Sequence, residues 1–141
     1  MILYLWIAIG SALGGCLRYA LGRAMVTNST SFPWSTLLIN FLGSFVIGFF
    51  GTLTLTGSRF AVPETVRLFI MVGICGSFTT FSSFSLQTFD LIRAGDWGRA
   101  VANVVLSVLL CLGAVALGHM AALPGNDAMA ITQTADEECA S

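Results

Sequence analysis

The sequence has very little charge. Of its 141 residues only 9% are charged, whereas a soluble domain usually carries about 25%. It contains no lysine, so its six cations are all arginine, and its net charge is −1. So few charges cannot cover a water-facing surface, and they cannot form a basic surface for nucleic acid. We therefore predict an integral membrane protein that binds no nucleic acid.

Motifs of enzyme chemistry are also absent. The chain has no HExxH motif, no GxSxG motif and no pair of carboxylates at membrane depth. Its four cysteines show no CxxC spacing, and three of them lie in apolar runs, as small hydrophobic residues do. We predict that the protein is not an enzyme and has no disulfide framework.

What the sequence does have is long apolar runs. About 20 apolar residues suffice for a helix to cross a bilayer, and four runs reach that length. They extend from Ile2 to about Ala24, from Pro33 to Thr56, from Pro63 to Arg93 and from Trp97 to Leu123. After Pro124 the residues become small, polar and acidic. We predict a four-helix transmembrane domain in residues 1–123 and a disordered tail in residues 124–141.

The third run is interrupted in its middle. Its uncharged part, from Leu68 to Phe89, contains Gly73 and Gly76 and then a cluster of threonine, serine and phenylalanine that ends near Phe84. Backbone groups freed by a broken helix cannot face lipid, so a break is tolerated only against protein or a watery path. We predict a broken third helix at which something small and polar crosses. The alternative is a kinked helix whose free groups are closed by threonine hydroxyls.

Uncharged polar and aromatic side chains accompany this break. Asn40 lies in the second run, where an unpaired amide costs roughly 2–7 kcal/mol, so a ligand or a partner helix must meet it. We favour a functional role for Asn40 over a packing role. Phe81 and Phe84 are three residues apart and share a helical face, and the positive edge of a phenyl ring can face an anion. The alternative is that both rings fill space against lipid or protein.

The arginines bear on orientation and assembly. Arg18, Arg23, Arg93 and Arg99 flank the first and third connections, and Arg59 and Arg67 flank the second. This positive-inside bias is weak, so the sequence favours neither orientation. Four helices enclose little interior, so a transport role predicts a homo-oligomer. Arg18 either snorkels to the interface or, as we favour, binds backbone carbonyls of a neighbouring helix.

Three motifs follow one another along these runs. They are Gly14-Gly-x-x-Arg18-Tyr, Thr36-Leu-x-x-Asn40-x-x-Gly43-Ser-Phe-x-x-Gly48 and Gly73-x-x-Gly76-x-x-Thr79-Thr-Phe81-Ser-x-Phe84-Ser. In this order they resemble the Fluc (CrcB) family of fluoride channels, over essentially residues 2 to 120. Two positions depart from the family pattern: Ser77 stands where a second glycine is usual, and Gln87 stands where a glutamate is common.

The resemblance implies an all-α membrane protein with four transmembrane helices per subunit and a broken third helix. It implies an antiparallel homodimer of dual topology, a multi-pass protein of the bacterial inner membrane. It further implies a fluoride-selective ion channel that exports fluoride passively from the cytoplasm and relieves fluoride toxicity. The partners that it implies are the fluoride ion, the lipid bilayer and a second copy of the chain.

The resemblance also assigns roles to particular residues. Ring edges facing fluoride would come from Phe81 and Phe84, a hydrogen bond in the pathway from Asn40, and a further polar track from Thr80, Ser83 and Ser107. Backbone carbonyls of Gly76 and Thr79 from both subunits would hold a structural Na⁺ at the dimer centre. Arg18 corresponds to the family's arginine at the end of the first span.

Two other functions compete with the channel. A small proton-coupled multidrug exporter also has four spans, but it needs a glutamate within the membrane, typically in the first run, and that run contains no acidic residue. A membrane subunit that transports nothing would not require Asn40 or the hydroxyl groups. We favour the channel, because the subunit hypothesis leaves the uncharged polar break unexplained.

Overall fold

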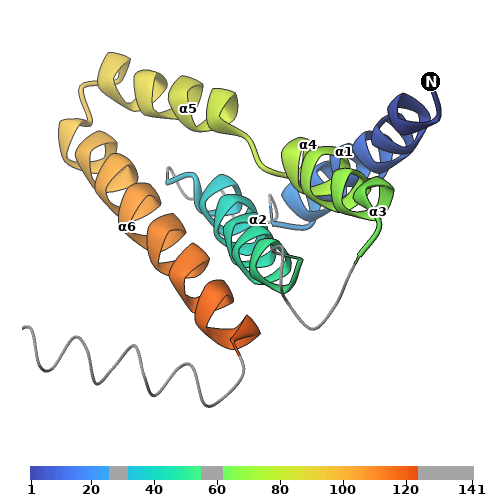
Figure 1. Ribbon diagram of the computed structural model, residues 1–141. Helices are drawn as coiled ribbons and strands as arrows, with labels where there is room; N and C mark the ends of the chain where they lie inside the picture. The colour runs from blue at the N-terminus through green and yellow to red at the C-terminus, as the bar shows by residue number, and fades with distance from the viewer. Residues whose placement is uncertain (26–31, 55–61, 124–141) are drawn as a thin grey trace, which may run out of the picture.

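The described part of the chain is helical and contains no strand. The computed structural model describes residues 1–25, 32–54 and 62–123 (Figure 1). Four stretches are long and apolar enough to cross a membrane: Ile2–Met25, Trp34–Leu53, Glu64–Arg93 and Trp97–Ala122. The predicted all-α membrane class with four membrane-capable segments is therefore confirmed. The tail predicted in residues 124–141 lies outside the described residues.

Three of the four segments are single helices. They are α1 (Ile2–Met25), α2 (Trp34–Leu53) and α6 (Trp97–Ala122). A helix satisfies its own backbone hydrogen bonds within the segment, which is a requirement wherever the surroundings are hydrocarbon. Apolar side chains then cover the outside of each helix, and Leu109 on α6, for example, is 63% exposed.

The third segment is built from several shorter pieces. After Pro63, it consists of α3 (Glu64–Leu68), the π-helix η1 (Phe69–Cys75), α4 (Gly76–Phe78) and α5 (Phe81–Arg93). The sequence predicted no π-helix here. In Figure 1 the stretch from α3 to α4 lies beside α1, whereas α5 lies apart from it and continues towards α6.

The first close helix pair is α1 with η1. A Cβ atom added to Gly10 would lie 2.6 Å from the carbonyl oxygen of Phe69, and one added to Gly73 would lie 3.0 Å from the Cα of Gly10. Only residues without a side chain let two backbones approach so closely. Gly14, one turn further along α1, abuts Ile74, so the two elements run in the same direction.

The second close pair is α2 with α6. Gly48 on α2 abuts Val115 on α6, and a Cβ atom added to Gly118 would lie 2.7 Å from the backbone nitrogen of Phe49. Thr52, one turn after Gly48, lies beside His119, one turn after Val115, so α2 and α6 are also parallel. Tight packing of small residues thus joins segments that are not neighbours in the sequence.

A tight turn brings the chain from α5 into α6. Gly95 has a φ of 79°, a conformation that glycine adopts without strain. Asp96 then caps α6, because its side chain accepts a hydrogen bond from the backbone N–H of Arg99. Helix α6 begins at Trp97, where the fourth apolar run was predicted to begin, and α5 packs against α6.

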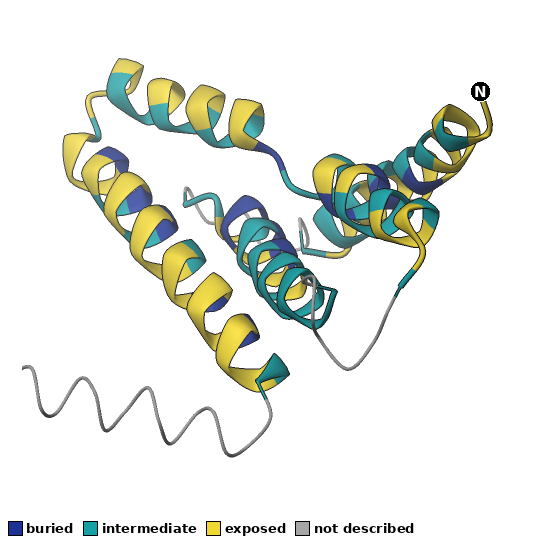
Figure 2. Cartoon of the chain, in the orientation of Figure 1, coloured by how far each residue is buried: buried dark blue, intermediate teal, exposed yellow. Residues whose placement is uncertain are grey.

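The interior of the single chain is thin. Buried positions on α6 form a stripe with helical spacing, consisting of Ala100, Asn103, Ser107, Ala114 and Gly118. Figure 2 shows that the outer surfaces of α5 and α6 are largely exposed, whereas α2 is mostly intermediate or buried. The polar members of this stripe, Asn103 and Ser107, lie where α6 meets α2 and α5, next to the candidate site.

Candidate functional site

Helical structure is interrupted between α4 and α5. Thr79 has φ −76° and ψ 156°, and Thr80 has φ −151° and ψ 104°, so both have extended backbones. β-Branched residues suit this conformation. The backbone N–H and the side-chain Oγ1 of Thr79 both donate to the carbonyl of Cys75, each at 3.0 Å. Threonine hydroxyls therefore close part of the helix end, as the kinked-helix alternative supposed.

Asn40 on α2 meets this interruption directly. Its Oδ1 accepts a hydrogen bond from the backbone N–H of Thr80 at 2.8 Å, and its Nδ2 donates to the carbonyl of Thr80 at 3.2 Å. The partner that an amide at this depth requires is thus a backbone within the same chain. Any role of Asn40 towards an ion remains a prediction.

The side chain of Thr80 organises the start of α5. Its Oγ1 accepts from the backbone N–H of Ser83 at 3.1 Å and donates to the Oγ of Ser83 at 2.9 Å. It also lies 3.2 Å from the Oγ of Ser82. Thr80 is therefore the N-cap of α5, and it gathers two further hydroxyl groups at that helix end. Thr80 itself is buried, at 6% exposure.

A pocket of about 480 Å³ opens beside the interruption. Five of the six residues predicted for the pathway line it, and they come from α2, α5, α6 and the interruption: Asn40, Thr80, Phe81, Phe84 and Ser107. Ser83, the sixth, is connected to the pocket through its hydrogen bonds to Thr80. The structure thus brings together residues that the sequence separates by up to 67 positions.

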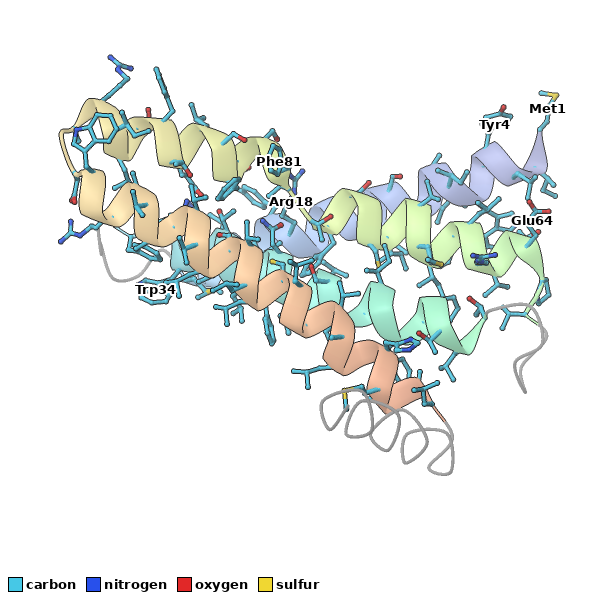
Figure 3. The ribbon with its side chains drawn as sticks, turned by 60° about the vertical axis from the view of Figure 1, so that its left-hand side comes forward. Met1, Tyr4, Arg18, Trp34, Glu64 and Phe81 are labelled. Atoms are coloured by element: carbon cyan, nitrogen blue, oxygen red, sulfur yellow. The ribbon has the colours of Figure 1, made fainter. Side chains whose placement is uncertain are left out.

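The two phenylalanine rings lie close together on α5. The ring centroids of Phe81 and Phe84 are 5.3 Å apart and the ring planes are tilted by 45°. Phe84 is half-buried, whereas Phe81 is 79% exposed in the single chain. In Figure 3 Phe81 stands at the end of α5 nearest the interruption. Both rings border a pocket whose polar part is uncharged, as an ion pathway of weak sites requires.

Gly76 and Thr79 fit the predicted cation site in one respect. In a continuous helix the N–H of Thr80 would bond to the carbonyl of Gly76, but here it bonds to Asn40 instead. Gly76 is also exposed. Backbone carbonyl oxygens are suitable ligands for a hard cation. In the described residues, no cluster of three or more His, Cys, Asp and Glu side chains offers a competing metal site.

Arg18 lies on α1 at the level of the interruption. It follows Gly14 by one turn, and Gly14 abuts Ile74 shortly before α4 ends. Figure 3 shows Arg18 near the junction of α1 with the end of α4. Arg18 is half-buried, and no other described residue of the single chain is a hydrogen-bond partner of its guanidinium. Both roles of Arg18 stay predictions.

Asn103 is a polar residue to which the sequence assigned no role. It is 1% exposed, and its Nδ2 donates to the Oγ1 of Thr88 at 2.8 Å. Thr88 in turn donates to the carbonyl of Phe84 at 2.7 Å. This chain of bonds ties α6 to the turn of α5 that carries Phe84. The spacing of Asn103 and Ser107, four residues apart, was the signal in the sequence.

Two further polar groups are placed by the structure. Thr52 on α2 donates to the carbonyl of Gly48 at 2.8 Å and lies 2.7 Å from Nδ1 of His119 on α6. The side-chain oxygen of Gln87 is buried and has no hydrogen-bond partner in the described part of the chain. Among the described residues, Cys16, Cys75 and Cys111 are free thiols.

Comparison with known proteins connects this site to a family. Residues 5–119 match the family model described as "CrcB-like protein, Camphor Resistance (CrcB)". A protein of Gluconobacter oxydans named "Fluoride-specific ion channel FluC" is 58% identical over 134 residues, covering 94% of this chain and 93% of that protein.

Proteins with the same name from other bacteria are similarly close. The relative in Methylocella silvestris is 56% identical over 87% of this chain and 95% of its own length. The relative in Opitutus terrae is 56% identical over 89% of this chain and 96% of its own length. The matched region includes most of each of the four membrane-capable segments and every residue of the candidate site, and the chain therefore belongs to the CrcB family.

Proposed function

We propose that this protein is a fluoride-specific ion channel that exports fluoride passively from the cytoplasm and so relieves fluoride toxicity. The observation that supports it most is the pocket beside the α4–α5 interruption, where uncharged donors and phenyl rings from three helices meet. Relatives named as fluoride-specific channels share most of the chain. It is a transporter rather than an enzyme, and a multi-pass protein of the bacterial inner membrane.

The chemistry of fluoride matches these donors. Fluoride is small and strongly hydrated, so a pathway must supply many hydrogen bonds as water is removed. Hydroxyl groups of Thr80, Ser83 and Ser107 and the positive ring edges of Phe81 and Phe84 supply them without a fixed charge. Conduction needs several weak sites, and a lysine or arginine in the pathway would hold the anion too tightly.

The third membrane segment is proposed to be one interrupted span. The stretch Glu64–Arg93 contains α3, η1, α4 and α5, with the extended residues Thr79 and Thr80 between the last two. Non-helical backbone at membrane depth is tolerated where it lies against protein or a hydrated cavity. Here it lies against Asn40 and beside the pocket, which is the surrounding that such an interruption requires.

A second copy of the chain is proposed to complete the channel, in an antiparallel dimer of dual topology. Only between 11% and 22% of the residues in an apolar 18-residue stretch of each membrane segment are buried, so most of the surface of each segment is available to a second chain. The exposure of Phe81 leaves one side of the proposed pathway uncovered. The weak arginine bias is compatible with insertion in both orientations.

A structural Na⁺ is proposed at the centre of this dimer. The carbonyls of Gly76 and Thr79 from both subunits would hold it, and the diversion of the Thr80 N–H to Asn40 favours an open carbonyl at Gly76. The cation would supply positive charge that draws two helix ends together. Arg18, one turn beyond Gly14 on α1, is proposed to support the same region structurally.

A fluoride-electrode assay tests the proposal. Purified protein is reconstituted into liposomes loaded with potassium fluoride, and efflux is started with valinomycin, with potassium chloride liposomes as the control. We expect rapid fluoride efflux and chloride efflux near that of protein-free liposomes. Equal release of both anions, or no fluoride release above protein-free liposomes, would contradict a fluoride-specific channel. Fluoride release that depends on a proton gradient would favour a coupled exporter.

A further inference from the structure

We propose that Asn40 is a positioning residue, whose carboxamide holds the backbone of Thr80 extended and thereby places Phe81 on the pathway. This role rests on the proposed function and is distinct from donating a hydrogen bond to fluoride. In this role, the side chain of Asn40 determines the backbone conformation at the interruption, although it lies on α2, 40 positions earlier in the chain.

The two hydrogen bonds of Asn40 act as a pair on one residue. Oδ1 accepts from the N–H of Thr80 at 2.8 Å, and Nδ2 donates to the carbonyl of the same residue at 3.2 Å. With φ −151° and ψ 104°, Thr80 presents both groups as a residue in a β-strand does. The carboxamide therefore makes the two hydrogen bonds that a neighbouring strand would make with Thr80 in a β-sheet. An uncharged acceptor and donor side by side are needed, and among the side chains only a primary amide and a protonated carboxyl group offer them.

This pair of bonds separates α4 from α5. A continuous helix would direct the N–H of Thr80 to the carbonyl of Gly76. Asn40 takes that N–H instead, while Thr79 turns its own N–H and hydroxyl back to Cys75. Gly43, three residues after Asn40, abuts the methyl group of Thr79. Helix α2 therefore contacts both extended residues.

The orientation of Thr80 determines the first turn of α5. Thr80 caps that helix through Ser83, and Phe81 is the next residue. If the backbone of Thr80 is released, its φ and ψ can change and the ring of Phe81 moves with them. Phe84 has a second attachment, through Thr88 to Asn103 on α6. Loss of Asn40 is thus expected to displace Phe81 more than Phe84.

The variant Asn40→Ser separates positioning from donation. Serine keeps an uncharged donor on the pocket wall, but it is too short and has the wrong geometry for paired bonds to Thr80. Backbone amide exchange is measured on the purified full chain without fluoride, and fluoride and chloride efflux are measured in liposomes. Leu42→Val is the matched control, because Leu42 lies on α2 and is 39% exposed.

In the unmodified protein we expect the Thr80 amide to exchange at least about tenfold more slowly than the Ser82 amide, which lies in the first turn of α5 and lacks a helical acceptor. In Asn40→Ser we expect the Thr80 amide to approach the exchange rate of Ser82. Fluoride efflux should fall at least about tenfold, and the ratio of fluoride to chloride efflux should fall with it. Leu42→Val should leave all three quantities unchanged.

Several outcomes would overturn the positioning role. Efflux of Asn40→Ser within about twofold of the unmodified protein would show that a donor at this position suffices. Unchanged exchange at Thr80 in the variant would show that Asn40 does not hold it. If the variant does not fold, equal exchange of Thr80 and Ser82 in the unmodified protein would still refute the inference. Absence of fluoride efflux from the unmodified protein would refute the proposed function and leave the exchange result standing.

Discussion

At the scale of single residues, the two phenylalanines beside the interruption are held by different means. Phe84 is half-buried, and its carbonyl is bonded to Thr88, which Asn103 holds from α6. Phe81 follows Thr80 directly and is 79% exposed in the single chain. The two rings are nevertheless in contact distance, with centroids 5.3 Å apart. In the proposed pathway their edges would face the same ion from two differently anchored positions.

Replacing either ring with a branched aliphatic side chain tests this arrangement. Isoleucine is apolar but has no positive edge, so Phe81→Ile and Phe84→Ile should each reduce fluoride efflux to that of protein-free liposomes. Size-exclusion chromatography should show the same oligomer as the unmodified protein. Phe89→Ile is the control, because Phe89 lies on α5, is 55% exposed and does not line the pocket. Unchanged efflux in both test variants would remove the rings from the pathway.

At the scale of helices, small residues set how closely the segments pack. Gly10 and Gly73 let α1 and η1 cross, and Gly48 and Gly118 let α2 and α6 cross. In lipid, such packing is a main source of helix association, since apolar surface gains little by leaving hydrocarbon. The α2–α6 crossing also fixes the distance between Asn40 and the polar stripe of α6. The pocket can therefore form only if α2 and α6 cross this closely.

A single added methyl group tests this crossing. In Gly118→Ala the new Cβ atom would meet the backbone of Phe45 and Phe49, so we expect a loss of about 1–3 kcal/mol of stability and a lower Tm in detergent. Gly113→Ala on the same helix is the matched control, because no atom lies within 4 Å of its new methyl group. It should be neutral or slightly stabilising, as alanine favours helix. An equal Tm for the two variants would contradict the close crossing.

At the scale of the whole molecule, the third membrane segment connects two parallel helix pairs. Its first part pairs with α1, and its last part, α5, packs on the pair formed by α2 and α6. The α3–α4 stretch packs on α1, and α5 packs on α6. The pocket lies where this segment passes from one pair to the other, beside α2. The family match ends at residue 119 and the last helix ends at Ala122, so we expect the proposed conduction path to lie within these helices.

Removal of residues 124–141 tests that boundary. The truncated chain retains the matched region and the four membrane segments, so its fluoride efflux should be within about twofold of the full chain. Equal amounts of protein per liposome, checked by quantitative gel analysis, are the control. A loss of efflux at equal reconstitution would assign the tail a part in conduction or assembly.

Much of this arrangement can be predicted from the sequence, and the reasons differ between its parts. The membrane segments follow from composition alone, because a helix of sufficient length is what a long apolar run forms in lipid. The membership of Asn40, Phe81 and Phe84 in one site followed from a resemblance to a family. The paired bonds between Asn40 and Thr80 could not be predicted, because they depend on how two helices cross. The π-helix in residues 69–75 also escaped prediction, since a shift from four-residue to five-residue bonding leaves no mark on hydrophobicity.

The parallel pairing of the helices has a consequence for how the chain matures. Helix α1 makes its closest backbone approach with η1, and α2 makes its closest approach with α6, so each must wait for a segment made later. During synthesis, the first two spans enter the bilayer without their final neighbours. The close contacts at Gly48 and Gly118 can form only after the last span has left the ribosome. Ribosome-bound chains that stop before Trp97 should therefore leave α2 accessible to membrane proteases, and protection of α2 should arise only with the final span.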